Sequence, residues 1–272
     1  MESPPEAERR AVIVKLGGSV LTRKREVERL RPKVIARLAR EVASVRDRPI
    51  VLLHGAGSFG HPGARRFGLA RPPEPGSSAA HRTRGAAIVA AEVRRLHLAV
   101  LRALVAAGAS PASVPMATHA RNREGVLVAL DASPIDDALA RGHLPVSFGD
   151  VVPDDAWGSS ILSADTIAAA LVPVLRPERV VFVSDVVGIL EGVPGRKRTV
   201  VREVTDATVA SLRPPSGAPD VTGGIRAKAA AMRTIARAGA DACLINGLTD
   251  DAVSRVLRGE TIYGSWAHAT SR

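Results

Sequence analysis

The sequence predicts an α/β fold with a mostly parallel β-sheet that helices cover on both faces. Short β-rich apolar runs alternate along the chain with longer helical patterns, as in proteins built from strand–helix–strand units. Glycine-rich segments follow several predicted strands, at the edge of the sheet where such proteins bind ligands. The 272 residues contain no evident repeat or linker, so we expect one compact unit with two lobes.

Periodicity and helix-breaking residues place the expected elements along the chain. The expected strands are short apolar runs at residues 11–16, 50–54, 113–116, 126–130, 144–148, 179–184 and 242–246. The expected helices are 26–45 (with Pro32 as a break or first-turn residue), 79–107, 135–141, 164–175, 206–212, 224–238 and 250–258. Residues 62–78 and 214–220 are rich in proline and glycine, and we expect irregular structure there, the first stretch as a lid-like connection.

Composition narrows the classes of function. The formal net charge is +11, but the basic residues are spread over several segments and 3% of the residues are aromatic, so stacking surfaces for nucleic acid are scarce. We expect no nucleic acid partner, and the positive charge instead favours anionic substrates. No apolar run reaches the about 18 residues typical of a membrane span, and residues 1–10 lack the apolar segment of a secretory signal. Cys243, the single cysteine, lies in an apolar run, so we expect a buried thiol in a cytoplasmic protein.

The segment HGAGSFGH at residues 54–61 is the most informative part of the sequence. Its three glycines allow the backbone to turn tightly and to approach a ligand closely. Exposed N–H groups in such a loop bind anions, and phosphate is the expected one. Histidines at both ends of the segment flank this backbone.

Two other interpretations of this segment fail. Gly55, Gly57 and Gly60 match the glycine pattern of dinucleotide-binding folds, but that pattern needs an acidic residue at a strand end about 20 positions later. Here this position falls near Glu74, within the proline-rich stretch RPPEPG, which cannot form a central strand. A hydrolase nucleophile elbow would need glycine where Ala56 stands. A phosphate-binding loop is therefore the interpretation that the residues favour.

Two further glycine-rich segments are candidates for phosphate binding. In KLGGS, Lys15 lies near the end of an apolar strand, where a cation either extends to the sheet edge or binds a phosphate. In DVTGGIRAK, Gly223 and Gly224 open a predicted helix whose free N–H groups and dipole favour an anion. Lys228 lies one turn into that helix and is either a solvated surface lysine or a phosphate ligand.

Three carboxylates stand beside these segments. Asp165 either caps the predicted helix 164–175 or is a buried acid that holds two lysines. Asp150 and Asp185 each follow a predicted strand, at the edge of the sheet that faces the ligand. The sequence contains no Walker A pattern, zinc-ligand spacing or EF-hand loop. Phosphate binding is therefore expected to combine the three glycine-rich loops.

Seven segments together carry a family resemblance. They are KLGGSVLTRK (15–24), HGAGSFGHP (54–62), PVSFGDVV (145–152), ILSAD (161–165), SDVVGIL (184–190), DVTGGIRAK (220–228) and GE-x-IYGS (259–265). Their order and spacing resemble the amino acid kinase superfamily, and GSFGH followed by DVTGG resembles its isopentenyl phosphate kinase branch. This resemblance implies one domain over residues 1–272, folded as an open three-layer αβα sandwich. About residues 11–155 would bind the phosphate acceptor and about 156–272 would bind ATP.

The resemblance also implies an activity, which is ATP-dependent phosphorylation of isopentenyl phosphate to isopentenyl diphosphate in a homodimer. Mg²⁺ would accompany ATP, and no residue is assigned as a metal ligand. Lys15, Lys24 and Lys228 would neutralise the transferring phosphoryl group, Asp165 would orient two of these lysines, and His61 would hold the acceptor phosphate. The implied nucleotide-binding residues are Lys15, Leu16, Gly17, Gly18, Ser19, Gly57, Asp185, Gly223, Gly224 and Lys228. The implied acceptor-binding residues are Ala56, Gly60, His61, Gly149, Asp150, Ser163 and Ala164.

Two positions depart from the family pattern. Ala164 replaces the usual glycine of Ser-Gly-Asp, and its methyl group is expected to narrow the acceptor site. Val187 replaces the second acid of Thr-Asp-Val-Asp-Gly, so a polar contact on the ATP side is expected to be lost.

Two alternative functions remain open from the sequence. One is a fosfomycin kinase-like enzyme that phosphorylates a phosphonate, and the other is a non-catalytic nucleotide-binding sensor. The presence of Lys15, Lys24, Lys228 and Asp165 argues against the sensor. An isoprenoid tail needs an apolar pocket, and the region 63–100 offers apolar side chains for one: Phe67, Leu69, Ile88, Val89 and Leu96.

Overall fold

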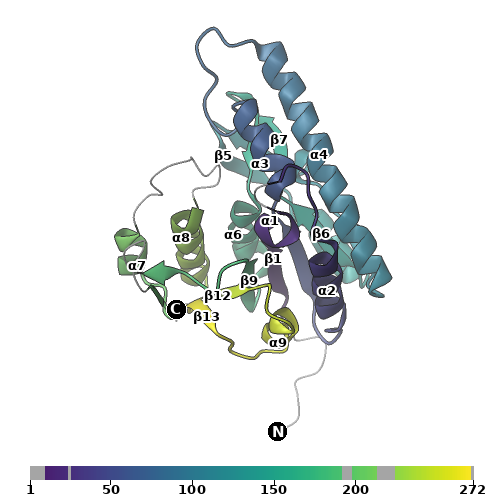
Figure 1. Cartoon of the computed structure of the whole chain (residues 1–272), viewed down its shortest axis with the longest axis vertical. Coiled ribbons are helices and arrows are strands. Elements are labelled where there is room, and N and C mark those ends of the chain that lie inside the picture. The colour runs from purple at the N-terminus through teal and green to yellow at the C-terminus, as the bar shows by residue number, and fades with distance from the viewer. Residues whose placement is uncertain (1–9, 24–25, 192–197, 213–223, 271–272) are drawn as a thin grey trace.

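The structure is a computed structural model that describes residues 10–23, 26–191, 198–212 and 224–270. Over these residues, a seven-stranded sheet forms the centre of the molecule (Figure 1). In spatial order its strands are β13 (Gly264–Ala267), β12 (Asp241–Asn246), β9 (Arg179–Ser184), β1 (Val12–Leu16), β2 (Ile50–His54), β6 (Leu144–Phe148) and β3 (Pro111–Ser113). Neighbouring strands are parallel except β13, which is antiparallel to β12. The predicted, mainly parallel sheet is confirmed.

Helices cover both faces of this sheet because its central strands are apolar on both faces. β1 reads VIVKL and is wholly buried between β2 and β9, so its alternate side chains enter two different cores. The core around Val12 and Val14 is closed by α2 (Pro32–Ala43), the second half of α4 (Ala79–Ala106) and α9 (Ala252–Leu257). The core around Ile13 is closed by α5 (Ser133–Ala140), α6 (Ala164–Leu175) and α8 (Gly224–Arg237). These layers confirm the αβα sandwich.

A smaller sheet continues from the end of β6 (Figure 1). Its four strands over the described residues are β5 (Val126–Leu130), β4 (Ala120–Arg123), β7 (Asp150–Asp154) and β8 (Gly158–Leu162). Gly149 alone separates β6 from β7, so it joins the two sheets. A third core, which includes Val89, Val93, Phe148 and Val151, packs between this sheet, α3 (Gly57–Arg66) and the first half of α4. Strands β4, β7 and β8 were not predicted, because their sequences mix polar residues and proline with few apolar ones.

The start of one helix and the start of one irregular stretch were predicted wrongly. The helix expected at 26–45 begins at Pro32, which takes the first helical position because its ring fixes φ and its missing N–H is not needed there. The stretch 62–78 is helical as far as Arg66, with Pro62 inside α3. Pro62 leaves the carbonyl of Ser58 without its helical donor, and the N–H of Glu28 donates to that oxygen instead (3.3 Å).

The remaining elements are short. A strand expected at 113–116 lies earlier, as β3, and a 3₁₀ helix follows at Met116–Thr118. The others are α1 (Gly18–Leu21), α7 (Asp206–Ser211) and the ribbon of β10 (Leu190–Glu191) with β11 (Thr199–Val200). The irregular stretch expected at 214–220 lies outside the described residues. Cys243 is buried, as expected, and within the described ranges no helix is long and apolar enough to cross a bilayer.

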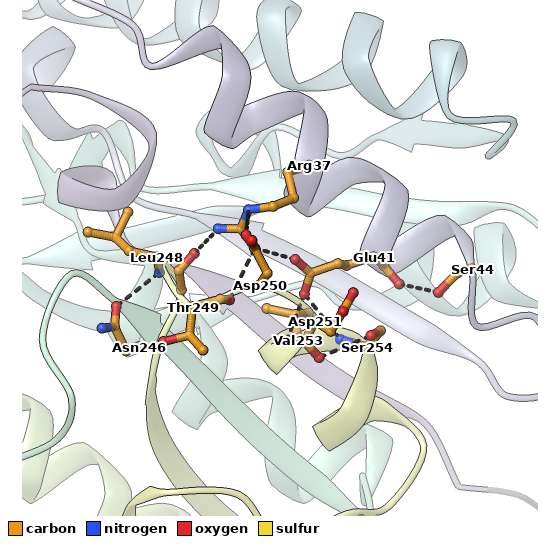
Figure 2. A network of polar contacts seen from close by, with 11 residues as sticks. Arg37, Glu41, Ser44, Asn246, Leu248, Thr249, Asp250, Asp251, Val253 and Ser254 are labelled. Atoms are coloured by element: carbon orange, nitrogen blue, oxygen red, sulfur yellow. Dashed lines mark hydrogen bonds and ion pairs between the residues drawn. The ribbon is translucent and has the colours of Figure 1, made fainter.

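A polar network ties α2 to the segment that joins β12 and α9 (Figure 2). Arg37 forms an ion pair with Glu41, donates to the carbonyls of Gly247 and Thr249, and lies 3.1 Å from the carboxylate of Asp250. The buried Glu41 carboxylate accepts from the N–H groups of two residues in the first turn of α9, Val253 (2.9 Å) and Ser254 (3.4 Å). The network therefore fixes the segment that follows β12 at the carboxyl edge of the sheet.

Candidate active site

The candidate site lies at the carboxyl edge of the large sheet. β1, β2, β6 and β9 are parallel, so the residues that follow them meet at one edge. These residues are Gly17 after β1, Gly55 after β2, Gly149 after β6 and Asp185 after β9. The fold thus brings together segments that are more than 100 residues apart in the sequence.

A cluster of three charged side chains forms the floor of this edge. Lys15 on β1 lies 2.6 Å from one carboxylate oxygen of Asp165, in the first turn of α6. Lys228 of α8 donates to the other oxygen at 2.7 Å, and its ammonium lies 4.9 Å from the centre of the Phe182 ring. All three charged side chains are less than one-fifth exposed. We call Lys15, Asp165 and Lys228 the charged cluster.

The cluster changes how its members hold protons. Burial by itself would raise the pKa of Asp165, but the charges of Lys15 and Lys228 and their hydrogen bonds hold that pKa far below its usual range. Burial and the neighbouring charge of Lys15 lower the pKa of Lys228 to about 8, against the opposing effect of Asp165. Two cations share one anion, so the cluster carries excess positive charge that a phosphate group can balance.

Two glycine-rich loops pack against each other with no room for side chains. A Cβ added to Gly18 would lie 2.3 Å from the backbone nitrogen of Gly57, and one added to Gly57 would lie 2.7 Å from the carbonyl oxygen of Gly18. Gly57 also has a φ of +51°, which disfavours any side chain. Thr22 joins the loops because its hydroxyl donates to the Gly18 carbonyl (2.8 Å) and accepts from the N–H of Ser58 (2.9 Å). Backbone of both loops is therefore available at the site.

On the other side, the first loop contacts the end of β9. The hydroxyl of Ser19 donates to the carboxylate of Asp185 at 2.7 Å, and the N–H of Gly17 donates to the carbonyl of Val183 at 2.7 Å. A Cβ on Gly17 would lie 2.8 Å from that same carbonyl oxygen. These contacts join three of the predicted nucleotide-binding residues in one continuous surface.

A pocket opens between the charged cluster and α4. Its polar and charged lining residues are Lys15, His61, Asp150, Ser163 and Asp165, and the half-buried His61 comes from the first turns of α3. Backbone of the loop at 55–60 and of Gly149 forms one side. The rest of the lining is apolar: Ala64, Val89, Val93, Val151, Ile161, Leu162 and Ala164. A ligand with a charged head and a small apolar tail fits this division of the surface.

The carboxylate of Asp150, which was expected to bind the acceptor, has partners within the protein. Asp150 lines the pocket, but its buried carboxylate is bound on both oxygens by the guanidinium of Arg94 at 3.0 and 3.1 Å. The N–H groups of Ala117 and Val151 donate to the same carboxylate. Burial raises the pKa of Asp150, and Arg94 opposes that rise. The carboxylate therefore ties α4 to β7, and nothing in the sequence distinguished Arg94 from the other arginines of α4.

Several predicted site residues have not yet been placed. Lys24 and Gly223 lie outside the described residues, and Gly224 begins α8. Ser163, and not Asp165, caps α6, since its hydroxyl accepts from the N–H of Thr166 at 3.0 Å. Leu16, Gly18 and Gly60 lie at the edge with the loops described above. Over the described residues, no group of three or more histidine, cysteine and acidic side chains is placed to hold a metal ion.

Of the five apolar side chains expected around an acceptor tail, one lines this pocket. Val89 lines the pocket, but Leu69 and Leu96 are buried in hydrophobic cores and Ile88 is 42% exposed. Phe67 packs on Gly85, where an added Cβ would lie 2.2 Å from the ring. Four apolar side chains of the lining were not predicted: Val93, Val151, Ile161 and Leu162. Helical spacing from Val89 to Val93 was the signal that could have identified one of them.

Comparisons with known proteins agree with this geometry. A model of the amino acid kinase family matches residues 10–246. Isopentenyl phosphate kinase from Thermoplasma acidophilum is 34% identical over 223 residues, which cover 81% of this chain and 85% of that protein. Isopentenyl phosphate kinase from Methanothermobacter thermautotrophicus is 30% identical over 262 residues, which cover 93% and 97%.

A solved structure is similar over nearly the whole chain. It was determined for an isopentenyl phosphate kinase, superposes with a TM-score of 0.82 and is 28% identical in sequence. The match covers 94% of this chain and 99% of that one, so no large part of either fold lacks a counterpart. The chain therefore belongs to the amino acid kinase family, within its isopentenyl phosphate kinase branch.

Proposed function

We propose that this protein transfers the γ-phosphoryl group of ATP to isopentenyl phosphate and so forms isopentenyl diphosphate. The observation that supports it most directly is the junction of the charged cluster with the small, apolar-walled pocket that His61 lines. The relatives named above carry the same activity in their names. Transfer between two phosphate groups needs little covalent help from the protein, because the nucleophile is already an anionic oxygen.

Charge neutralisation is the main task that we assign to the side chains. Lys15 and Lys228 would bind the oxygens of the transferring phosphoryl group, and Asp165 would keep the two ammonium groups in place between turnovers. Lys24 would add a third positive charge. Mg²⁺ would be held mainly by the phosphates of ATP, as Mg²⁺ commonly is in kinases, since the described residues offer no acidic cage for it.

The two sides of the edge would bind the two substrates. Gly17, Gly18, Ser19 and Asp185 would face the nucleotide, together with Gly223 and with Gly224, which begins α8. Residues 11–155 would then form the acceptor lobe and residues 156–272 the ATP lobe. The lobes would meet at the charged cluster, to which β1 contributes Lys15 and α6 and α8 contribute the other two members.

On the acceptor side, we assign the phosphate to His61 and to backbone N–H groups near Ala56 and Gly60. The apolar lining beyond them would contact the isopentenyl group. That lining favours an isoprenoid over the small polar phosphonate of a fosfomycin kinase-like enzyme. The complete charged cluster disfavours a non-catalytic nucleotide sensor, since burying two lysines on one acid is costly without a use for the charge.

We further propose a homodimer in the cytoplasm. Exposed apolar side chains on α4, Ile88 (42%), Leu98 (47%) and Val105 (61%), support a subunit contact along this 28-residue helix. A buried free thiol at Cys243 suits a reducing compartment. Neither nucleic acid nor a membrane is a proposed partner.

An ADP-release assay with isopentenyl phosphate, dimethylallyl phosphate and fosfomycin tests the proposal. Turnover should be fastest with isopentenyl phosphate. Faster turnover of fosfomycin would favour the phosphonate kinase. Absence of turnover with all three acceptors would favour the sensor, provided that the protein binds ATP.

A further inference from the structure

Two buried histidines lie next to the proposed acceptor site and have no part in the function described above. His54 is the last residue of β2, and His97 lies in the middle of α4. Nε2 of His54 is 3.0 Å from Nδ1 of His97, and Nε2 of His97 is 2.8 Å from the hydroxyl of Ser113 on β3. At the other end, Nδ1 of His54 lies 3.2 Å from the carbonyl oxygen of Gly55. We call His54, His97 and Ser113 the histidine chain.

The carbonyl at one end fixes the direction of every hydrogen bond in the chain. A carbonyl oxygen only accepts, so Nδ1 of His54 must carry the proton and donate to Gly55. Nε2 of neutral His54 then accepts, and it takes its hydrogen bond from Nδ1 of His97. Nε2 of His97 accepts in turn from the hydroxyl of Ser113. One set of neutral tautomers therefore satisfies all of the ring nitrogens.

Neutral rings agree with their surroundings. Burial lowers the pKa of His54 to about 3, and the charges of His97, when protonated, and of Lys15 lower it as well. Burial and the charge of Arg94 lower the pKa of His97 to about 4. Both rings also contact Phe148: the His54 ring stacks on it with 5.4 Å between ring centres, and the His97 ring is tilted against it with 4.2 Å between ring centres.

The hydrogen bond from His54 orients the peptide group that follows it. A trans peptide is planar, and its C=O and N–H groups point in opposite directions. There are no cis peptides among the described residues, so the N–H of Ala56 points away from the His54 ring when the Gly55 carbonyl points toward it. Gly55 and Ala56 both line the pocket that contains His61 and Lys15.

We propose that His54, held in place by His97 and Ser113, is a positioning residue that turns the N–H of Ala56 toward the phosphate of the acceptor. This inference rests on the proposed function, because it takes the pocket at His61 as the site of the acceptor phosphate. His54 does not itself touch the substrate. Its effect is on the affinity for the acceptor, whereas the charged cluster acts on the transferring group.

Two substitutions at position 54 separate positioning from packing. The side-chain nitrogen of asparagine takes the place of Nδ1 of histidine, and the end of a glutamine side chain takes the place of Nε2. His54→Asn therefore keeps the donor to Gly55 and leaves Nδ1–H of His97 without its acceptor. His54→Gln keeps an acceptor for His97 and loses the donor to Gly55.

The two variants should rank in opposite orders for stability and for acceptor binding. His54→Asn should have the lower Tm, because it leaves a buried donor unsatisfied. His54→Gln should have the higher KM for isopentenyl phosphate, by about tenfold over the wild type, with the KM for ATP little changed. In His54→Asn the KM for isopentenyl phosphate should rise by less than about threefold. The proposal would be overturned if the KM for isopentenyl phosphate were higher in His54→Asn than in His54→Gln. An equal KM in the two variants would overturn it as well.

Calorimetry keeps this test independent of the reaction. Titration of each protein with isopentenyl phosphate and with inorganic phosphate should give the weakest binding for His54→Gln. If the wild type binds these ligands but does not turn over isopentenyl phosphate, the proposed function fails while the rank order still tests the positioning role. If the wild type binds neither, both proposals fail.

A milder variant covers the case in which position 54 tolerates no change. Ser113→Ala removes the outer donor of the histidine chain without a change in the buried rings. We expect it to fold normally and to raise the KM for isopentenyl phosphate by about two- to threefold. Unchanged KM and unchanged calorimetric affinity in folded Ser113→Ala would also contradict the proposal.

Discussion

The two polar clusters at the carboxyl edge differ in charge and in the face of the sheet on which they lie. The charged cluster lies on the face covered by α6 and α8, where one carboxylate holds two lysines at 2.6 and 2.7 Å. The histidine chain lies on the opposite face, against α4, and all its members are neutral. β1 and β2 are adjacent, so the two clusters are separated by little more than the thickness of the sheet.

In the proposed function, the difference follows from what each side of the site has to do. A phosphoryl group in transfer needs positive charge close by, so the protein bears the cost of burying two ammonium groups. A peptide group that only has to be turned needs a hydrogen bond of fixed direction, which a neutral imidazole supplies with far less desolvation. We therefore expect changes in the charged cluster to act on kcat, and changes on the acceptor side to act on the KM for the acceptor.

The largest effect should come from Lys228→Ala. Loss of a charge that contacts the transition state should lower kcat by roughly 10²-fold or more, measured by steady-state kinetics with both substrates saturating. Lys33→Ala, which changes an exposed lysine on α2, is the control and should leave kcat unchanged. A change confined to KM would mean that Lys228 binds the ground state and the transition state equally well. The charged cluster would then not differ from the acceptor side in the kinetic parameter that it affects.

His61→Ala should have the next largest effect, on the acceptor side. A lost hydrogen bond to a charged phosphate should lower kcat/KM for isopentenyl phosphate by roughly 30-fold, with Tm close to that of the wild type. His143→Ala removes an exposed histidine outside the pocket, so its kcat/KM should not change. Unaltered kcat/KM in His61→Ala would remove this residue from the site.

A pH titration should detect the charged cluster and not the histidine chain. Because the pKa of Lys228 is lowered to about 8, kcat/KM for ATP should fall by about tenfold per pH unit above that pH. In the ternary complex, the phosphates should raise this pKa and move the fall in kcat to higher pH. In Lys228→Arg the side chain keeps its positive charge over this pH range. The fall in kcat/KM for ATP should therefore be absent in this variant, even if its kcat is lower than that of the wild type.

Stability provides the control for that titration. The unfolded chain keeps the proton of Lys228 up to its ordinary pKa of 10.5, so between pH 8 and 10.5 the unfolded state binds more protons than the folded one. The contribution of this lysine to the free energy of unfolding therefore rises with pH over that window. Activity lost in parallel with a falling Tm above pH 8 would point to unfolding and not to Lys228.

The smallest effect should come from Ser19→Ala, on the nucleotide side. The Ser19 hydroxyl donates to Asp185 at 2.7 Å and joins the loop after β1 to the end of β9. Its loss should raise the KM for ATP by about three- to fivefold and leave the KM for isopentenyl phosphate unchanged. Equal changes in both KM values would mean that the two sides of the site are not separate.

Much of the fold could be predicted from local patterns. The apolar runs that became β1, β2, β6, β9 and β12 are long enough to identify central strands without any partner. Strands β4, β7 and β8 were missed because polar residues within them find partners on other strands of the sheet, as the side-chain nitrogen of Asn122 does in the hydroxyl of Ser160 at 2.8 Å. The helix expected at 26–45 shows the opposite error. Helical spacing was read from residue 26, but the helix begins only at Pro32.

By itself, the sequence determined the fold class, the family and the positions of the glycine-rich loops. These depend on residues that act through their own backbone, such as Gly57 with its φ of +51°. Only the tertiary structure decided which polar groups pair: Asp150 with Arg94, and His54 with His97, 43 positions away. The physical reason is that backbone conformation is set locally, whereas the proton state and use of a buried polar group depend on partners that only the packed chain brings within hydrogen-bond distance.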